Sequence, residues 1–158
     1  MMRRKDREVT SRADIEAILQ QCRVAHIAFQ DEEAPYIVPM NFGYDWQGEA
    51  PVLYFHCAAE GKKLDLIKNC PKVGVEMDCG HQLVGEEKAC SYGFLFQSIT
   101  GWGVAELVET LEEKQHSLER LMFQQTGKEF SITPEETKTV TVFRIRLCSF
   151  SAKARKTF

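Results

Sequence analysis

Short runs of strand-forming residues separated by turns constrain the fold of this 158-residue chain more than any other feature. Parallel sheets need a long crossover, usually a helix, between successive strands, and the sequence shows no such alternation. It also lacks the Gly-x-Gly-x-x-Gly turn of a dinucleotide-binding sheet. The pattern therefore predicts a mainly β fold, an antiparallel barrel with peripheral helices, as a single domain over residues 1–158. The predicted strands are 24–29, 35–42, 52–56, 73–77, 94–107 and 140–147, and the predicted helices are 12–22, 62–69 and 110–125.

Three segments depart from this regular pattern. The stretch from Asp78 to Cys90 is polar and contains two glycines, which predicts a loop. Gly101-Trp-Gly103 interrupts the fifth predicted strand and indicates a bulge, a bend or close backbone approach. The basic opening, Arg3 to Arg7, predicts a solvated N-terminal arm over residues 1–10 that a partner subunit can order.

Composition excludes several classes of function. A net charge of -3 argues against nucleic acid as the main partner. No apolar run approaches the roughly 20 residues that span a bilayer, and the N-terminus lacks the hydrophobic core of a signal peptide. We therefore expect no membrane partner, a cytoplasmic location, and six cysteines that remain thiols. Cys79-Gly-His81 followed by Cys90 matches no standard zinc spacing, so no metal is predicted.

The segment from Leu53 to Ile67 contains the best candidate site. An apolar strand ends at His56, and a loop with Gly61 then brings Lys62 and Lys63 to the start of a helix. Free N–H groups at a helix N-terminus attract anions, and lysines there oppose the helix dipole unless an anion is present. The segment predicts a phosphate site, the alternative being an ordinary exposed helix start.

The strand histidines and the strand that contains Pro39 are further candidates for the site. His56 is either a solvent-exposed or structural imidazole, or a proton donor, because its ordinary pKa is close to neutrality. His26, inside an apolar strand, is interpreted as structural. Pro39 limits ladder pairing in its strand, so that backbone groups of Val38, Met40 and Asn41 can address the edge of a planar ring. The alternative for that strand is an edge strand with a bend.

Four segments, in order, resemble the FMN-binding split-barrel proteins related to pyridoxamine 5'-phosphate oxidase, and among them the nitroimidazole-resistance-type branch. They are Arg3–Arg7, Pro35–Tyr44, Leu53–His56 with Gly61–Lys63, and Ser98–Gly103. The resemblance implies a six-stranded, Greek-key-like antiparallel split barrel. It also implies a homodimer with two FMN molecules at its interface.

The resemblance also implies roles for individual residues. His56 matches the histidine that faces the substrate pocket and is the candidate catalytic residue. Lys62 and Lys63 match the positions that hold the FMN phosphate. The basic tail, residues 152–158, lacks the pattern that binds pyridoxamine phosphate in the oxidase proper, which argues against vitamin B6 oxidation. The expected cofactor-binding residues are Val38, Pro39, Met40, Asn41, His56, Cys57, Lys62, Lys63 and Ser98.

The leading functional hypothesis is an FMN-dependent oxidoreductase that reduces a small oxidised molecule, with a nitroaromatic as the example that the resemblance suggests. The alternative is a flavin- or haem-binding module without turnover, used for storage or sensing. For haem, His26 and His56 are the strand histidines that can serve as ligands. A purely structural dimer is a third possibility.

Overall fold

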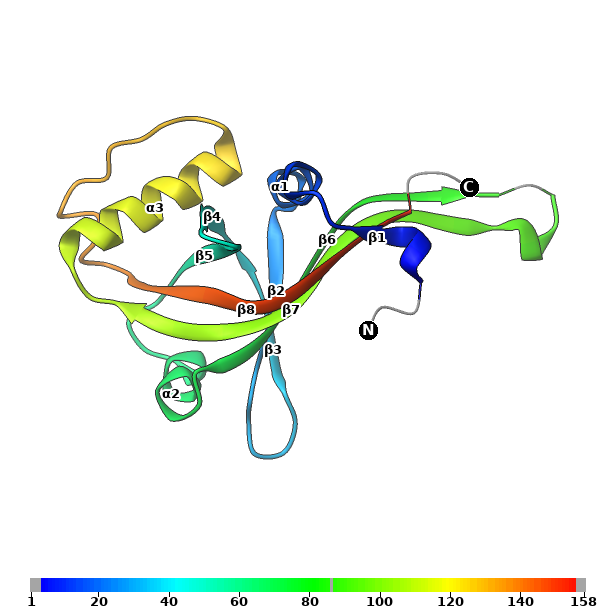
Figure 1. Cartoon of the computed structure of the whole chain (residues 1–158). Helices are drawn as coiled ribbons and strands as arrows, with labels where there is room; N and C mark the ends of the chain where they lie inside the picture. Colours follow the sequence, from blue (N-terminus) through cyan, green and yellow to red (C-terminus); the bar gives the residue numbers. More distant parts are fainter. Residues whose placement is uncertain (1–3, 86, 156–158) are drawn as a thin grey trace.

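A single antiparallel sheet with three α-helices makes up the computed structural model, which describes residues 4–85 and 87–155 (Figure 1). The strand order is β3-β2-β6-β7-β8-β5-β4, and β1 pairs with β8. The strands are β1 (Glu8–Val9), β2 (Val24–Phe29), β3 (Tyr36–Asn41), β4 (Gly43–Gln47), β5 (Ala50–Cys57), β6 (Lys72–Val84), β7 (Gly93–Val108) and β8 (Thr141–Arg155). The helices are α1 (Arg12–Gln21), α2 (Lys62–Asn69) and α3 (Leu111–Thr126), with short 3-10 turns at Lys5–Arg7 and Ala89–Ser91.

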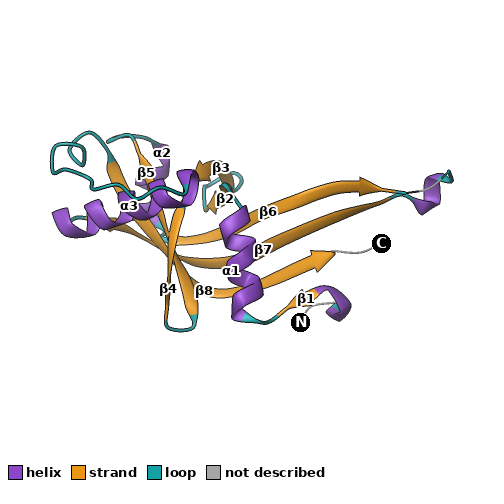
Figure 2. Cartoon of the chain, turned by 90° about the horizontal axis from the view of Figure 1, so that it is seen from above, coloured by secondary structure: helices purple, strands orange, loops and turns teal. Residues whose placement is uncertain are grey.

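The sheet curls around an apolar core because alternate residues of its strands are large and hydrophobic. Phe55 of β5 and Phe143 of β8 are fully buried there and stack with ring centroids 5.1 Å apart. Ile18 and Leu19 of α1 are buried in the same core, which α1 covers from one side. Seen from above, β6, β7 and β8 run on beyond the barrel as an extended ribbon (Figure 2). No helix among the described residues has both the length and the apolar composition to cross a membrane.

The mainly antiparallel fold class is confirmed, although the sheet has eight strands rather than the six predicted. Residues 78–84 were expected in a loop and instead continue β6 along β7, after a register shift between Cys79 and Gln82. Gly80, at φ 66°, lies within that irregularity. The ribbon projects beyond the barrel, so its side chains do not alternate between core and solvent, and the sequence there shows no strand period.

Two smaller differences from the predicted strands, and one agreement with them, concern short segments. Gly43–Gln47 lies outside the six predicted strands and forms β4, which pairs with β5 across the turn at Gly48. The N-terminal arm was expected to be solvated, yet Glu8–Val9 pairs with β8; residues 1–3 of that arm lie outside the described residues. The predicted irregularity at residues 101–103 is confirmed as a register shift between β7 and β8 at Trp102/Gly103.

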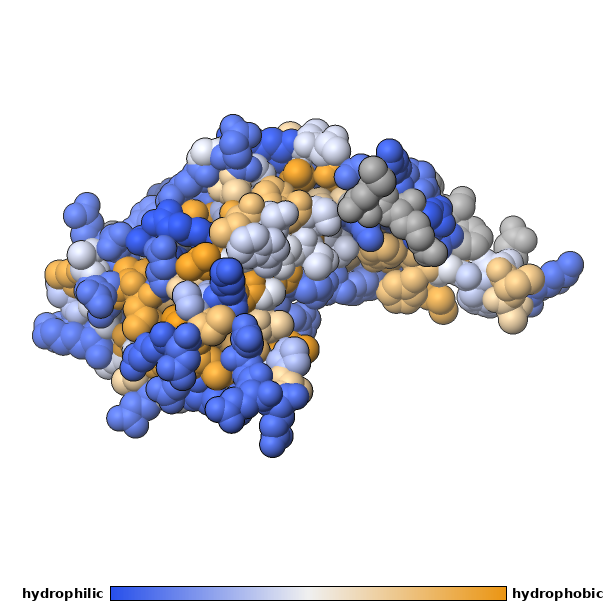
Figure 3. Space-filling view, turned by 60° about the horizontal axis from the view of Figure 1, so that its bottom comes forward, coloured by the Kyte–Doolittle hydropathy of each residue, from blue (hydrophilic) through white to orange (hydrophobic). Residues whose placement is uncertain are grey.

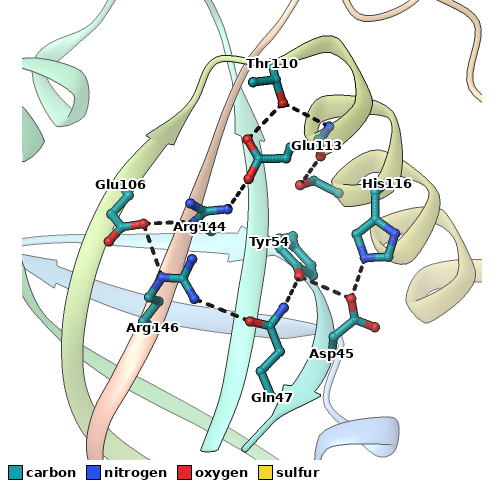
Figure 4. A network of polar contacts seen from close by, with 10 residues as sticks. Asp45, Gln47, Tyr54, Glu106, Thr110, Glu113, His116, Arg144 and Arg146 are labelled. Atoms are coloured by element: carbon teal, nitrogen blue, oxygen red, sulfur yellow. Dashed lines mark hydrogen bonds and ion pairs between the residues drawn. The ribbon is translucent and has the colours of Figure 1, made fainter.

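Polar contacts fix the start of α3 to the outside of the barrel (Figure 4). The Thr110 hydroxyl accepts from the backbone N–H of Glu113, which makes Thr110 a typical N-cap. Arg144 of β8 donates to Glu113 at 2.8 Å and to Glu106 of β7 at 2.9 Å. Arg146 donates to the same oxygen of Glu106 at 3.2 Å. These charge-assisted bonds connect the helix start to two strands.

A second group of contacts ties the middle of α3 to β4 and β5. His116 Nε2 lies 2.5 Å from Asp45 Oδ2, and Arg120 Nε lies 2.9 Å from Asp45 Oδ1. The hydroxyl of Tyr54 donates to Asp45 at 3.1 Å. Burial and the negative charge of Asp45 raise the pKa of Tyr54 to about 12, so the phenol remains a donor at neutral pH.

The Glu106 contacts make stability depend on pH in the acid range. The hydrogen bond from Arg144 is the main reason why the pKa of Glu106 is held below its usual value of 4.5. A lowered carboxyl pKa stabilises the folded state above pH 4.5, and this contribution is lost as the pH falls through the folded-state pKa. We expect Glu106→Gln to lower the free energy of unfolding at pH 7 by up to about 1 kcal/mol.

Urea unfolding of the wild type and Glu106→Gln between pH 7 and pH 3 measures this effect. The difference between the two proteins should shrink below pH 4.5 and vanish at the acid end. Glu112→Gln is the control, because Glu112 lies exposed in the first turn of α3, next to Glu113, and forms no ion pair within the described part of the chain. A difference that stays constant down to pH 3 would contradict the prediction.

Candidate functional site

A hollow of about 280 Å³ lies between the free edge of β3 and the end of β5. The hollow is formed by β3, the end of β5 and the start of α2. These are the segments in which the sequence predicts the binding of a phosphorylated cofactor. Its lining residues are Val38, Pro39, Met40, Asn41, His56, Cys57, Ala58 and Lys63. Of the nine expected cofactor contacts, the hollow therefore brings together all except Lys62 and Ser98.

The hollow exists because the barrel is not closed at this point. β3 ends the strand order, so one of its edges pairs with β2 and the other meets no strand of the described residues. β5 pairs with β4 only as far as Tyr54, which leaves His56 and Cys57 beyond the end of β4. Proline is common on such edge strands, because it has no backbone N–H to donate and an edge strand needs no donor on its free side. Pro39 therefore suits its position in β3.

The β3 wall offers both apolar and polar surface. Val38 and Met40 are half-buried and pack against the core, whereas Pro39 and Asn41 are exposed. Figure 3 brings forward the side of the molecule that carries α2 and the β2–β3 hairpin, where hydrophobic surface lies between charged side chains. A wall of this kind suits a flat, largely apolar ring with a polar rim.

His56 and Cys57 form the β5 side of the hollow and differ in their surroundings. The His56 side chain is exposed and makes no hydrogen bond with any described residue. Its imidazole therefore remains available to a ligand. Cys57 is buried, and burial raises the pKa of its thiol although the positive charge of Lys63 opposes the rise. Cys57 is accordingly a neutral thiol at pH 7 rather than a nucleophile.

Lys63 and the start of α2 supply the positive end of the hollow. Gly61, at φ 145°, precedes the helix and offers no side-chain cap, so the first N–H groups of the helix are left for another acceptor. Lys63 forms no ion pair with any residue that the structure describes, and it lines the hollow. A free ammonium group beside an uncapped helix start is a suitable place for a phosphate.

Lys62 has a different partner. Its Nζ lies 2.6 Å from Asp31 Oδ2 in the β2–β3 turn and 5.3 Å from the ring centroid of Tyr36. The hydrogen bond raises the pKa of Lys62 and lowers that of Asp31. Lys62 thus connects α2 to the β2–β3 hairpin, and the structure does not bring it to the hollow.

Ser98 lies in another place on the sheet. It pairs with Asp78 across β6 and β7 and lines a separate hollow of about 410 Å³ with Glu76, Asp78, His81, Phe94 and Phe96. His26 points to the same outer face of the sheet, where its Nδ1 lies 3.1 Å from Glu76 Oε2. Among the described residues, no cluster of three or more histidines, cysteines and carboxylates is arranged to hold a metal.

Ala58 also lines the hollow and was not among the expected contacts. It directly follows Cys57 in the chain, so its proximity to the strand end was the signal that could have found it.

An open antiparallel barrel with a cationic helix start in its gap defines the class of flavin-binding split barrels. The model of the pyridoxamine 5'-phosphate oxidase family matches residues 11–154, which is nearly the whole sequence. The chain therefore belongs to the pyridoxamine 5'-phosphate oxidase family. Among curated proteins, none matches this sequence.

Solved structures show the same relationship. A candidate 5-nitroimidazole antibiotic resistance protein from Bacteroides thetaiotaomicron is 30% identical, with a TM-score of 0.78 over 93% of this chain and 86% of that chain. The flavocytochrome Anf3 from Azotobacter vinelandii is 18% identical, with a TM-score of 0.78 over 99% of this chain and 73% of its own. An FAD- and haem-binding protein from Mycobacterium smegmatis is also 18% identical, with a TM-score of 0.78 over 96% of this chain and 75% of that chain. The latter two show a shared fold.

Proposed function

We propose that this protein binds FMN in the hollow between β3 and β5 and uses it to reduce a small oxidised molecule, such as a nitroaromatic compound. The observation that carries the proposal is the position of Lys63. Its ammonium group forms no ion pair with the described residues and lies at a helix start without a side-chain cap, at one end of a hollow with a half-apolar strand wall. The cationic helix start suits the phosphate of FMN, and the half-apolar β3 wall suits its ring.

The residues of the hollow have separate roles in binding the cofactor and in the reaction. When bound, FMN supplies hydride or electron transfer to the substrate. Lys63 and the α2 N–H groups hold the phosphate, while Val38 and Met40 exclude water from one side of the ring. His56 donates a proton, or a hydrogen bond, to the negative charge that develops on the substrate, since its imidazole is exposed at the hollow. The likeness to a candidate 5-nitroimidazole resistance protein supports a nitro group as the substrate's reducible part.

We also propose that the working form is a homodimer with FMN at its interface. A hollow of about 280 Å³ is smaller than the roughly 300–1,000 Å³ of sites that enclose small ligands, so one protomer covers FMN only in part. The adjacent outer face of the sheet exposes Ile37 (61%) and Trp102 (46%), large apolar side chains that a second copy would cover. A second copy can also bring its own Ser98 to the ligand, which the first protomer does not.

A non-catalytic binding module uses the same hollow and is the alternative. The solved structures that share this fold include a flavocytochrome and a protein that binds FAD and haem. His56, exposed and unpaired among the described residues, is placed to serve as a haem ligand, whereas His26 is held by Glu76. The absorption spectrum of the purified protein separates flavin from haem directly.

The proposed function predicts how a His56→Ala variant behaves. We expect the wild type to bind one FMN per chain in a particle of two chains, and His56→Ala to retain FMN with at least tenfold slower reduction of a nitroaromatic substrate. Flavin fluorescence quenching, sedimentation equilibrium and anaerobic stopped-flow kinetics measure the three quantities. A wild type that does not bind FMN refutes the cofactor, and full turnover by His56→Ala removes the imidazole from the mechanism.

A further inference from the structure

Two side-chain amides meet between the end of β3 and the last turn of α3. Asn41 lines the hollow, and Gln125 lies behind it, outside the lining. Gln125 Nε2 donates to the backbone carbonyl of Phe42 at 2.9 Å and to that of Arg23 at 3.1 Å. Asn41 Nδ2 donates to the same Arg23 carbonyl at 3.0 Å and to Gln125 Oε1 at 3.2 Å.

The surrounding carbonyl groups fix which way each amide points. A backbone carbonyl only accepts hydrogen bonds, so Gln125 must turn its NH₂ group toward Phe42 and Arg23. Its oxygen is then left to accept from Asn41. A reversed Asn41 amide would set its oxygen against both the Arg23 carbonyl and the Gln125 oxygen, each about 3 Å away. Both hydrogens of the Asn41 amide are therefore committed to the protein.

One polar atom of Asn41 consequently remains for a ligand. Its Oδ1 receives no hydrogen bond from any described residue, and the side chain is exposed at the hollow. Asn41 would otherwise offer either a donor or an acceptor by rotating its amide. Gln125 fixes the orientation of the Asn41 amide. Asn41 therefore presents only an acceptor, in one direction, on the β3 wall of the hollow.

We propose that Gln125 is a positioning residue: it holds the Asn41 amide so that Oδ1 accepts a hydrogen bond from a ring N–H of the ligand. This inference rests on the proposed binding of FMN, whose oxidised ring carries one N–H group, at N3. An acceptor on this wall favours a ring edge that carries an N–H over an edge that carries only carbonyl oxygens. In the second case the Asn41 oxygen would face a ring oxygen, and neither would receive a hydrogen bond. Asn41 and Gln125 thereby set the direction in which the ring lies along β3.

Nuclear magnetic resonance of the side-chain amides tests the positioning before any ligand is added. In the wild-type apoprotein, we expect both Asn41 Nδ2 protons to exchange with solvent about tenfold more slowly than in Gln125→Leu. Gln115→Leu is the matched control, since Gln115 lies on α3 and donates to the Ile132 carbonyl, away from Asn41. Gln125→Met, with a side chain of similar length, serves if Gln125→Leu does not fold. Equal exchange rates in the wild type and a folded Gln125 variant overturn the positioning role.

The ligand side is tested with FMN labelled with ¹⁵N at N3. We expect the N3 proton of bound FMN to be visible and slowly exchanging in the wild type and in Gln115→Leu, and to exchange at least about tenfold faster in the Gln125 variant. An N3 proton that exchanges freely in the wild-type complex overturns this inference while FMN binding itself stands. If FMN does not bind at all, the proposed cofactor fails and the ring contact fails with it, whereas the Asn41 exchange rates still decide the positioning role.

Discussion

Replacing Lys63 by glutamate should weaken FMN binding by at least about 100-fold. A hydrogen bond to a charged group contributes about 1.5–3 kcal/mol, and a factor of ten in Kd corresponds to about 1.4 kcal/mol. Reversing the charge adds repulsion to the lost contact, because the Lys63 side chain lines the hollow with no counter-ion among the described residues. Fluorescence titration of the apoprotein with FMN measures the change.

Riboflavin provides the internal control for this prediction, since it carries the same ring without the phosphate. Its affinity should change by less than about threefold in Lys63→Glu if the ammonium group contacts the phosphate alone. Lys68→Glu, at the exposed end of the same helix, is the matched protein control with the same change of net charge. Lys62→Ala should have a smaller effect, because Lys62 is engaged by Asp31. Equal losses for FMN and riboflavin would show that Lys63 does not bind the phosphate.

A methyl group at Gly43 should destabilise the fold more than any other single change considered for this chain. A Cβ at this position would lie against the backbone of Arg120 and Leu121 in α3, closer than van der Waals contact allows. Backbone atoms of a helix cannot rotate away, so α3 must shift from the barrel as a unit. Overpacking of this kind costs typically 1–3 kcal/mol and occasionally more, and we expect Gly43→Ala to reach about 3 kcal/mol.

Thermal and urea unfolding measure the effect of Gly43→Ala. A loss of about 3 kcal/mol corresponds to a fall in Tm of roughly 6–12 °C for a domain of this size. Gly74→Ala is the control, because a Cβ there meets only the Ala28 side chain, at 3.5 Å, which is an ordinary contact. Its Tm should change by no more than a few degrees. A Gly43→Ala protein as stable as Gly74→Ala would show that α3 adjusts freely on the barrel surface.

The sequence predicts those parts of the site whose signals are local. His56 and Lys63 flank a single turn containing Gly61, so the strand end, the loop and the helix start bring them together without help from the rest of the fold. The edge position of β3 likewise follows from Pro39. These segments lie at the hollow because each combines a clear secondary-structure boundary with a distinctive residue.

Contacts between distant parts of the chain could not be predicted in the same way. Adjacent helix residues point in directions about 100° apart, so Lys62 and Lys63 cannot serve the same partner, but only the position of Asp31 decides which lysine turns away. Gln125 carries no local signal at all, since its partners Arg23 and Phe42 are 102 and 83 residues away in sequence. The contacts of Gln125 depend on how α3 lies across the barrel.

The contact between Lys62 and Asp31 also bears on the mobility of the β2–β3 turn. It joins the β2–β3 turn to α2, so the hairpin that contains β3 and the helix that contains Lys63 are connected by this ion pair. The Lys62 side chain is 56% exposed, and an ion pair so exposed contributes at most about 1 kcal/mol. Thermal motion can break a tie of that strength often, and dissolved salt weakens it further. The β2–β3 turn can therefore detach from α2 and return while both elements stay folded, and it does so more readily as the salt concentration rises.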